Sequence, residues 1–422
     1  MPNLVRRIVR RASPKVVTAV VLAVALTVIS VAAGSGPALA QSDAGFRDWL
    51  TARVWPDARA QGVSQATFAA ATAGLSPDWK LPDLGKPGQP PKINWQSEFS
   101  APGRYLSEDK IAPLVSIGRA QMKQWASVLA AIEKRYGVPK EIVVAIWGRE
   151  SAFGRAAIPK SAIRTLATQA YAGTRRDLFY PELIAALKIL EGDHIPLAEM
   201  KSSIAGALGQ PQFLPSKYLA YAVDFDGDGR RDIWQSVPDT LASIANYLKQ
   251  HGWQSGRHWG HEARVPDTVN CAVEGPEQPY PLTDWTKAGV TRADGAALPG
   301  SGGDKRHLMM PAGRLGPAFI VSWNFYVLKE YNESDLYALF VGHVSDRLSG
   351  APPIAGKWNT VAGFRRGDVR AMQERLVAKG YDVGGADGLV GFKTRTAIGL
   401  WQRQNGLAPT CFPDAGLIGA IR

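Results

Sequence analysis

The sequence predicts a mainly α-helical protein with a smaller share of strands (α+β), made of two folded parts behind a basic leader. Three observations lead to this expectation. Apolar residues recur at steps of three and four in several stretches, and a segment rich in Pro and Gly divides the chain near residues 349–353. The 422 residues are 45% hydrophobic and 20% charged, which is typical of folded domains and excludes a wholly disordered chain.

The first forty residues have the layout of a secretory signal peptide. Five Lys and Arg residues and no acid precede an apolar stretch at 16–33, and the segment ends in Ala38-Leu39-Ala40. We therefore expect residues 1–40 to be a signal peptide that is cleaved after Ala40, and the mature chain to be exported to the periplasm. Because the apolar stretch could just reach across a bilayer, an uncleaved leader that anchors the chain is the alternative.

Charge and cysteine content narrow the function classes. The formal net charge is +12, and removing the five basic residues of the leader leaves +7. Ten Lys and Arg against five acids lie in residues 356–422, so most of the remaining charge belongs to the C-terminal part. Basic charge alone suits nucleic acid as well as an anionic wall polymer, and the expected export favours the envelope polymer over nucleic acid. Six His without an H-E-x-x-H motif disfavour a zinc hydrolase. Export would permit a disulfide between Cys271 and Cys411, but the sequence does not show that they meet.

Apolar spacing predicts the helices in chain order. Residues 41–75 have helical spacing, and residues 76–91 are rich in Pro, Gly and Lys, as in a surface loop. No period survives in residues 254–311, where we expect irregular structure with short strands. Clearer helices are predicted at 119–136 (with Met122, Trp125, Leu129, Ile132 and Tyr136 on one face and a stop at Gly137), from Pro139, from Pro238 to a stop at Gly252, at 317–331 and at 335–348.

The helix that Pro139 opens carries a candidate catalytic carboxyl. Val143, Ile146 and Trp147 form its apolar stripe, and Glu150 takes the next place on it. Burial disfavours the charged carboxylate and raises the pKa, as a proton donor requires. We expect Gly148 and Gly154 to open space around this side chain. The alternative is an ordinary helix-end Glu whose carboxylate is paired with Arg149 or Arg155.

Several ordered segments resemble the lytic murein transglycosylases of the membrane-bound B type, over roughly residues 45 to 348. They are 137–155 with AIWGRESAFGR, 203–216 with SIAGALGQPQFLPS, 223–229 with VDFDGDG, 245–247 with ANY, and 331–332 with YN. The resemblance implies a lysozyme-like catalytic domain at 41–348. It also implies non-hydrolytic cleavage of the β-1,4 bond between N-acetylmuramic acid and N-acetylglucosamine in peptidoglycan, with Glu150 as the single acid and base.

The implied chemistry explains why one carboxyl suffices. The C6 hydroxyl of the muramic acid attacks its own anomeric carbon and closes a 1,6-anhydro ring, so no second carboxylate is needed to activate water. A hydrolytic muramidase and a non-catalytic protein that binds the wall remain the alternatives.

By motif position, the resemblance also implies residues that line the sugar-binding groove. They are Ser203, Gln212, Tyr247, Tyr331, Asn332 and Tyr337. Amides and hydroxyls suit sugar hydroxyls, and aromatic faces suit sugar rings. Tyr247 and Tyr337 could equally be core tyrosines of their helices. Gln210-Pro211 stands where some family members have an aromatic residue and a glycine, so the contact at that edge differs here.

An Asp-rich loop predicts a site for a structural calcium ion. We expect no organic cofactor. Its oxygen ligands would be Asp224, Asp226, Asp228, the main chain of Arg230, and Asp239, which would replace the missing closing Glu of an EF-hand loop. The alternative is that Arg230 and Arg231 neutralise the acids without a metal.

The C-terminal part resembles the small three-helix peptidoglycan-binding domain. We expect a linker at 349–362 and this domain at 363–422, with helices from Asp368 to Lys379 and near 392–404 around the turn DGLVGFKT at 387–394. The resemblance implies that glycan strands of peptidoglycan are its partner, while partners in a wall-synthesis complex are unknown. Val390 stands where the usual residue is aromatic. The alternative is a domain that only packs on the first.

Overall fold

The computed structural model describes residues 42–84, 102–359 and 363–422. The expected signal peptide at 1–40 lies outside these residues, as do parts of the expected loop at 76–91 and of the expected linker. Of the helices in the described part, none combines the length and apolarity needed to cross a bilayer. The prediction of a mainly helical protein is confirmed.

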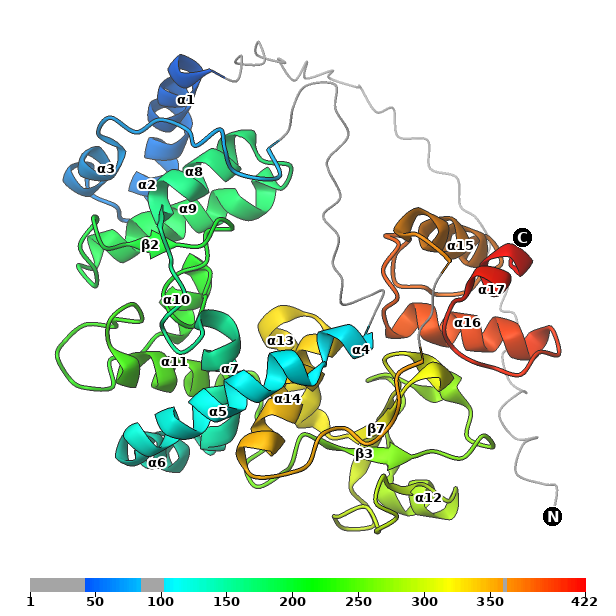
Figure 1. The fold of residues 1–422 in the computed structure, drawn as a ribbon. Helices are drawn as coiled ribbons and strands as arrows, with labels where there is room; N and C mark the ends of the chain where they lie inside the picture. Colours follow the sequence, from blue (N-terminus) through cyan, green and yellow to red (C-terminus); the bar gives the residue numbers. More distant parts are fainter. Residues whose placement is uncertain (1–41, 85–101, 360–362) are drawn as a thin grey trace, which may run out of the picture. The chain divides into compact units, whose positions relative to one another are not determined.

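One helical layer is formed by the N-terminal helices and a long antiparallel pair. Figure 1 shows the blue helices beside the green pair α8 and α9. Ser42 and Ser64 cap the first and the last of the N-terminal helices by accepting hydrogen bonds from Gly45 N and Thr67 N. The elements are α1 (Asp43–Trp49), the π-helix Leu50–Val54, α2 (Trp55–Ala60), α3 (Gln65–Thr72), α8 (Ala162–Ala172), α9 (Arg176–Glu191) and α10 (Pro215–Tyr221).

A second helical group surrounds the central helix α7 (Lys140–Ser151). Seven consecutive α7 residues, from Ile142 to Gly148, are buried, because α5, α6, α11 and α14 all pack against the helix. Gly137 ends the preceding helix in the left-handed conformation, as predicted, and Ser236 caps α11. The group comprises α4 (Pro102–Tyr105), α5 (Glu108–Gln124), α6 (Ala126–Tyr136), α7, α11 (Val237–Gln250), α13 (Trp323–Asn332) and α14 (Asp335–Leu348).

Two helix predictions need correction. The predicted helix at 119–136 is interrupted at Trp125, where the backbone leaves the helical region, so α5 packs on α7 and α14 while α6 packs on α11. The predicted helix at 317–331 begins instead with the strand β7 (Ala318–Val321), and only α13 is helical. All four residues of β7 are buried, and such a short apolar run fits a fully buried strand as well as one turn of a buried helix.

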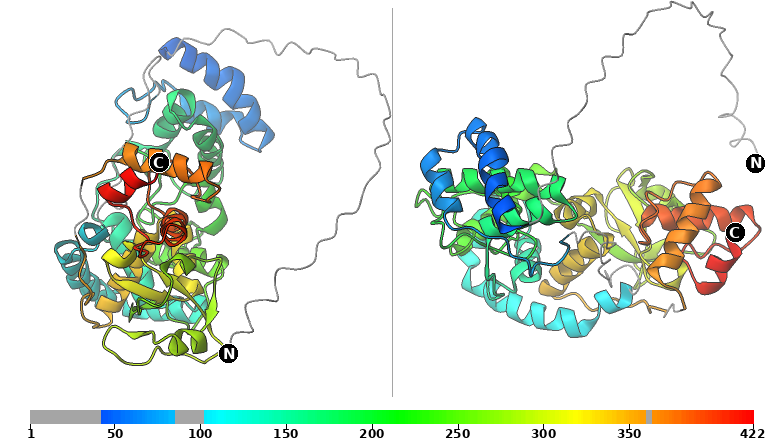
Figure 2. Two further views of the ribbon diagram at one scale, coloured as in Figure 1. Left: turned by 90° about the vertical axis from the view of Figure 1, so that its right-hand side faces the viewer. Right: turned by 90° about the horizontal axis from the view of Figure 1, so that it is seen from above.

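Four short strands of the expected irregular region and β7, which lies beyond it, form a five-stranded antiparallel sheet in the order β4-β6-β7-β3-β5. Its core strands pair Leu308 with Ile320 and His261 with Ile320, and Figure 2 shows them beside the helical part. The short helix α12 (Leu282–Lys287) in this region was not predicted. The strands are β3 (Gly260–Arg264), β4 (Tyr280–Pro281), β5 (Thr291–Arg292), β6 (Lys305–Met309) and β7; β1 (Lys160–Ser161) and β2 (Lys201–Ser202) form a separate ribbon.

The C-terminal part has its own small core within three helices, α15 (Arg366–Ala378), α16 (Phe392–Gln404) and α17 (Ala415–Ala420). Val390, in the place where an aromatic residue is usual, is buried in this core and is not available to a ligand. A disulfide joins Cys411 to Cys271 of the sheet region, with 6.1 Å between the Cα atoms. The described part of the expected linker is fixed to strand β3, because Glu262 accepts hydrogen bonds from Ala355 N and Gly356 N.

Candidate active site

Glu150 lies in the last turn of α7, which continues far enough to place it on the stripe predicted from the sequence. Val143, Ile146 and Trp147 are buried, whereas Glu150 is half-buried and so remains open to solvent on one side. Helix α7 ends immediately after it, because Ala152, Phe153 and Gly154 all adopt positive φ angles of 49°, 61° and 76°. This turn reverses the chain at the point where the carboxyl emerges.

Tyr337 of α14 donates a hydrogen bond of 2.5 Å to Oε1 of Glu150. Desolvation by the surrounding residues raises the pKa of Glu150, and this effect outweighs the Tyr337 hydrogen bond and the charges of Arg149 and Lys217, which lower it. The site therefore favours a carboxyl that still carries its proton at a pH where an exposed Glu is ionised. No carboxylate of the described residues is among the groups that shift this pKa.

The alternative of a charge-paired Glu150 does not fit the geometry. Arg149 donates to the hydroxyl of Tyr105 at 2.9 Å, Arg155 donates to the carbonyl of Ala152, and neither forms an ion pair with Glu150 in the described part of the chain.

The role expected for the two nearby glycines was wrong. A Cβ on Gly148 would lie 2.6 Å from the Phe153 ring, and one on Gly154 would lie 2.5 Å from Oε1 of Gln210. These glycines let neighbouring side chains approach closely; they do not open space around Glu150.

Three tyrosines extend from Glu150 as a connected cluster. The rings of Tyr337 and Tyr331 stack with centroids 6.1 Å apart, and those of Tyr331 and Tyr247 meet edge to face at 4.9 Å. Their hydroxyls are fixed, since Tyr331 donates to Pro211 O at 2.8 Å and Tyr247 donates to Glu330 O at 2.6 Å. All three rings are buried, as the alternative of core tyrosines implies. Tyr337 has a second role, because its hydroxyl also contacts the carboxyl of Glu150.

The other predicted groove residues are placed less directly. Gln212 is half-buried with φ 55°, and its amide folds back to donate to Gly209 O at 2.8 Å. The hydroxyl of half-buried Ser203 accepts hydrogen bonds from Ala205 N and Ala207 N. Asn332 is exposed at the end of α13 and faces the C-terminal part of the chain. Within the described residues, none of these three contacts Glu150.

Two residues near the carboxyl were missed from the sequence. Lys217 of α10 is half-buried, donates to the Tyr247 hydroxyl at 3.2 Å, and acts electrostatically on Glu150. Gln210 accepts a hydrogen bond of 2.7 Å from the Trp147 indole and donates to Trp234 O, so it joins α7 to the following loops. The only sequence signal for Lys217 was its place directly after Pro215-Ser216, because the tyrosine that it contacts belongs to a helix distant in the sequence.

The Asp-rich loop gathers part of the predicted calcium ligand set. Carboxylate oxygens of Asp224, Asp226 and Asp239 all lie within 4.8 Å of one another. Asp239 is completely buried, and burial raises its pKa to about 6. Asp228 is not in this group, and its Oδ1 accepts a hydrogen bond from Arg230 N at 2.8 Å.

The donor set of this cluster fits a hard cation such as Ca²⁺, which prefers carboxylate oxygens. The alternative of neutralisation by arginine is not supported, because neither Arg230 nor Arg231 forms an ion pair with these acids among the described residues. Arg231 instead lies against His194, 2.8 Å from its Nε2, and over the Tyr218 ring.

Comparison with known families gives two matches. Residues 45–346 match the Transglycosylase SLT domain, and residues 365–421 match the Putative peptidoglycan binding domain. The first match covers the helical part with Glu150 and the sheet region, and the second covers the three C-terminal helices.

Individual relatives agree with these matches. The chain is 34% identical over 232 residues to Membrane-bound lytic murein transglycosylase B of Escherichia coli K12, a stretch that covers 54% of this chain and 61% of that protein. The crystal structure of SltB3 from Pseudomonas aeruginosa in complex with NAG-anhNAM-pentapeptide is similar with a TM-score of 0.79 and 38% identity, covering 89% of this chain and 99% of SltB3. The Escherichia coli lytic transglycosylase Slt35 in complex with calcium is similar with a TM-score of 0.50 and 29% identity, covering 58% of this chain and 76% of that one.

Proposed function

We propose, since the chain belongs to the family of SLT-domain transglycosylases and carries a C-terminal peptidoglycan-binding domain, that it is a lytic murein transglycosylase with Glu150 as its single acid and base. The observation that carries this proposal is the state of Glu150: a half-buried carboxyl with a raised pKa, bonded to Tyr337 and without a second carboxylate acting on it. A glycosidase that activates water or forms a covalent intermediate uses two carboxyl groups.

The reaction balances with this one group. Protonated Glu150 gives its proton to the oxygen between N-acetylmuramic acid and N-acetylglucosamine, and the bond from the muramic anomeric carbon breaks. The C6 hydroxyl of the same muramic acid attacks that carbon and transfers its proton to the Glu150 carboxylate. The products are a strand with a 1,6-anhydro-muramic end and a strand with a free N-acetylglucosamine hydroxyl, and the enzyme recovers its starting protonation state.

Two neighbouring residues stabilise the charged state of Glu150. The Tyr337 hydroxyl stabilises the carboxylate formed after the first proton transfer, and the positive charge of Lys217 acts in the same direction. Gln212 and Ser203 offer an amide and a hydroxyl for sugar groups. The ring of Tyr331 stacks on that of Tyr337 and holds it in place beside Glu150.

The Asp-rich loop holds a structural calcium ion in this proposal. Asp224, Asp226 and Asp239 supply its carboxylate oxygens, and the ion would offset the mutual repulsion of three acids beside the start of α11. Its role in this proposal is structural, because Asp239 connects the loop to the start of α11 by accepting hydrogen bonds from Phe225 N and Asp232 N.

The location and the C-terminal domain complete the proposal. Residues 1–40 export the chain, residues 363–422 hold it on peptidoglycan, and the attachment raises the local concentration of the catalytic domain on an insoluble polymer.

The products of digestion test the proposed activity. Purified peptidoglycan incubated with the mature protein should release muropeptides that are one water lighter than those made by a hydrolytic muramidase. Glu150→Gln should abolish their release, while the matched variant Glu141→Gln, on the same helix but paired with Lys140, should retain it. Products that have gained a water, or an active Glu150→Gln variant, would contradict the proposal.

A further inference from the structure

A polar pocket lies in the sheet region, and none of the residues that line it belongs to the sites described above. It is bounded by the loop after α11, the loop before β4, the start of β6 and the start of α13. Its volume is about 470 Å³, which lies within the range of about 300–1,000 Å³ that is usual for small-ligand sites. The lining includes Gln254, Arg257, Lys305, His307 and Trp323.

Trp323, the first residue of α13, gives this pocket an exposed aromatic side chain. It is 45% exposed, and its indole is supported by the Tyr326 ring at 5.9 Å, which in turn meets the His307 ring edge to face at 4.9 Å. The other strongly exposed tryptophan of the described residues, Trp79, donates its indole N–H to Asp43 at 3.0 Å, whereas the indole N–H of Trp323 has no partner among them. A supported aromatic face with a free donor suits a sugar ring and its polar substituents.

Positive charge prevails in the pocket. Arg257 and Arg306 share one acid, since Asp304 binds both at 3.3 Å. Lys305 is exposed and forms no ion pair with any described residue. Burial lowers the pKa of His307, so this ring is neutral at pH 7 and the free charge is that of the lysine. The pocket therefore offers a cation to an anionic ligand.

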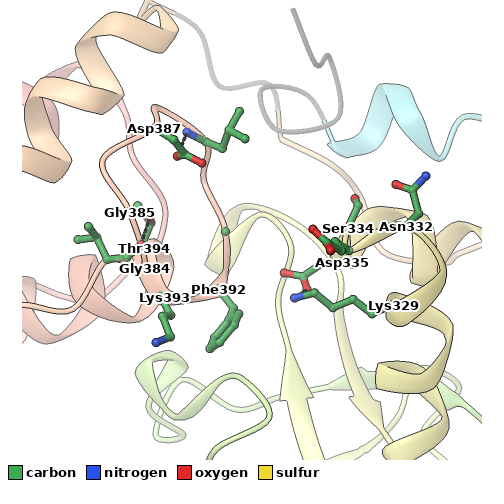
Figure 3. Close-up of a pocket in the computed structure, with 14 residues that line it drawn as sticks. Lys329, Asn332, Ser334, Asp335, Gly384, Gly385, Asp387, Phe392, Lys393 and Thr394 are labelled. Atoms are coloured by element: carbon green, nitrogen blue, oxygen red, sulfur yellow. Dashed lines mark hydrogen bonds and ion pairs between the residues drawn. The ribbon is translucent and has the colours of Figure 1, made fainter. Parts of the chain in front are cut away.

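The pocket between the α13–α14 turn and the loop before α16 differs in this respect (Figure 3). Its two lysines are already paired, because Lys329 is bonded to Asp335 at 2.7 Å and Lys393 is bonded to Asp382 at 2.8 Å. An anion that bound there would have to compete with an acid of the chain. Lys305 can pair with a ligand without such competition.

An exposed amide completes the set of polar groups. The main-chain N–H and C=O of Gln254 are bonded to the side chain of Asn324 at 2.8 and 2.9 Å, so the residue is fixed while its own side chain is exposed. That side chain can both donate and accept, as an acetamido group requires. Pro276 and Pro279 restrict the backbone of another wall, so a ligand has little of the pocket to order.

We propose that this pocket is a second saccharide site, which binds an N-acetylated sugar that carries a carboxylate. The sugar ring would lie on Trp323, the carboxylate would pair with Lys305, and the acetamido group would bond to Gln254. In peptidoglycan this chemistry belongs to an N-acetylmuramic acid unit whose lactyl carboxylate carries no peptide. A second contact with the same polymer would raise the local concentration of the catalytic domain on it. Binding at this site needs no chemistry at Glu150.

Fluorine NMR of the mature protein labelled with fluorotryptophan tests the site, because Trp323→Phe identifies the resonance of Trp323. Titration with N-acetylmuramic acid should shift this resonance and leave that of Trp79 in place. The dissociation constant should be about threefold to fivefold lower than for N-acetylglucosamine, which lacks the carboxylate, as one exposed ion pair contributes. Lys305→Gln should remove this preference, and Lys287→Gln, an exposed lysine of α12 outside the pocket, should keep it.

Two results of this titration would overturn the proposal: a Trp323 resonance that does not respond to N-acetylmuramic acid, and equal affinities for the two sugars. Glucuronic acid distinguishes the possible sources of the ligand, since it has a carboxylate but no acetamido group. Its binding should be weaker than that of N-acetylmuramic acid. Equal binding would assign the pocket to acidic polysaccharides other than peptidoglycan and would also overturn the proposal.

Digestion assays separate this site from the proposed function. Trp323→Ala should cleave short soluble glycan fragments at the rate of the unaltered protein, and its KM for long peptide-free strands should rise about threefold or more. If the unaltered protein cleaves neither substrate but its Trp323 resonance responds to N-acetylmuramic acid, only the proposed activity fails. If it cleaves both and the resonance does not respond, the second site fails while the activity stands.

Discussion

The Tyr337 hydroxyl lies 2.5 Å from Oε1 of Glu150, although the two residues are 187 positions apart in the chain. Tyr337 stands in the first turn of α14, and the first residue of that helix, Asp335, is bonded to Arg395 of the C-terminal domain. The proposed catalytic acid is thus connected to the wall-binding domain through one helix end. Four predictions follow from these contacts and from the cation site and the disulfide.

Tyr337→Phe should shift the pH dependence of cleavage. The Tyr337 hydrogen bond stabilises the charged carboxylate and lowers the pKa of Glu150, so its loss should raise that pKa further. The protonated, active form would then persist to higher pH. We expect the alkaline limb of kcat/KM to move up by about 1–2 pH units, the equivalent of a hydrogen bond to a charged group. Tyr331→Phe, whose hydroxyl donates to Pro211 O, is the control. A limb that stays in place or moves down would contradict the assignment.

Arg395→Met should destabilise the protein strongly. The variant leaves the carboxylates of Glu274 and Asp335 buried without their shared partner, and breaking such a pair costs about 3–5 kcal/mol. Urea unfolding of the mature protein measures this loss. Arg403→Met, an exposed arginine on the same helix, should change the free energy of unfolding by less than about 0.5 kcal/mol. Equal effects of the two substitutions would show that the buried network is unimportant.

Reduction of the disulfide should loosen the connection between the two domains. Cys271 and Cys411 are 140 residues apart, so opening the bridge frees a long loop in the unfolded chain. We expect Cys271→Ser with Cys411→Ser, or a reductant, to lower the free energy of unfolding by about 2–5 kcal/mol. The double serine variant should then be insensitive to reductant. An unfolding curve of the unaltered protein that reductant leaves unchanged would argue against the bridge.

Calcium should raise the thermal stability, and chelation should lower it. A ligand present at 100 times its dissociation constant and bound only by the folded state adds about 2.7 kcal/mol. Melting curves with calcium and with chelator should therefore differ by several degrees. The difference should vanish in Asp226→Asn and persist in Asp48→Asn, an exposed acid outside the cluster. Identical curves in the unaltered protein would remove the calcium site.

Local sequence patterns located much of the fold and the centre of the site. The stripe of Val143, Ile146 and Trp147 predicted that Glu150 lies at the edge of a buried helix face, because helical periodicity depends only on neighbouring residues. Helix ends at Gly137 and Gly252 followed from the conformational freedom of glycine. The same local rules could not distinguish a short buried strand from a buried helix turn at Ala318–Val321, nor foresee the break at Trp125.

Sequence by itself determined which side chains have the right chemistry: an acid on an apolar stripe, an Asp-rich loop, and a basic C-terminal domain. Only the tertiary structure decided which of them meet. It brought Tyr337 to Glu150, Arg395 to Asp335 and Cys411 to Cys271, and it filled the space beside Gly148 with the Phe153 ring. The physical reason is that periodicity and capping arise within a few residues, whereas these contacts depend on how separate elements pack to bury their apolar faces.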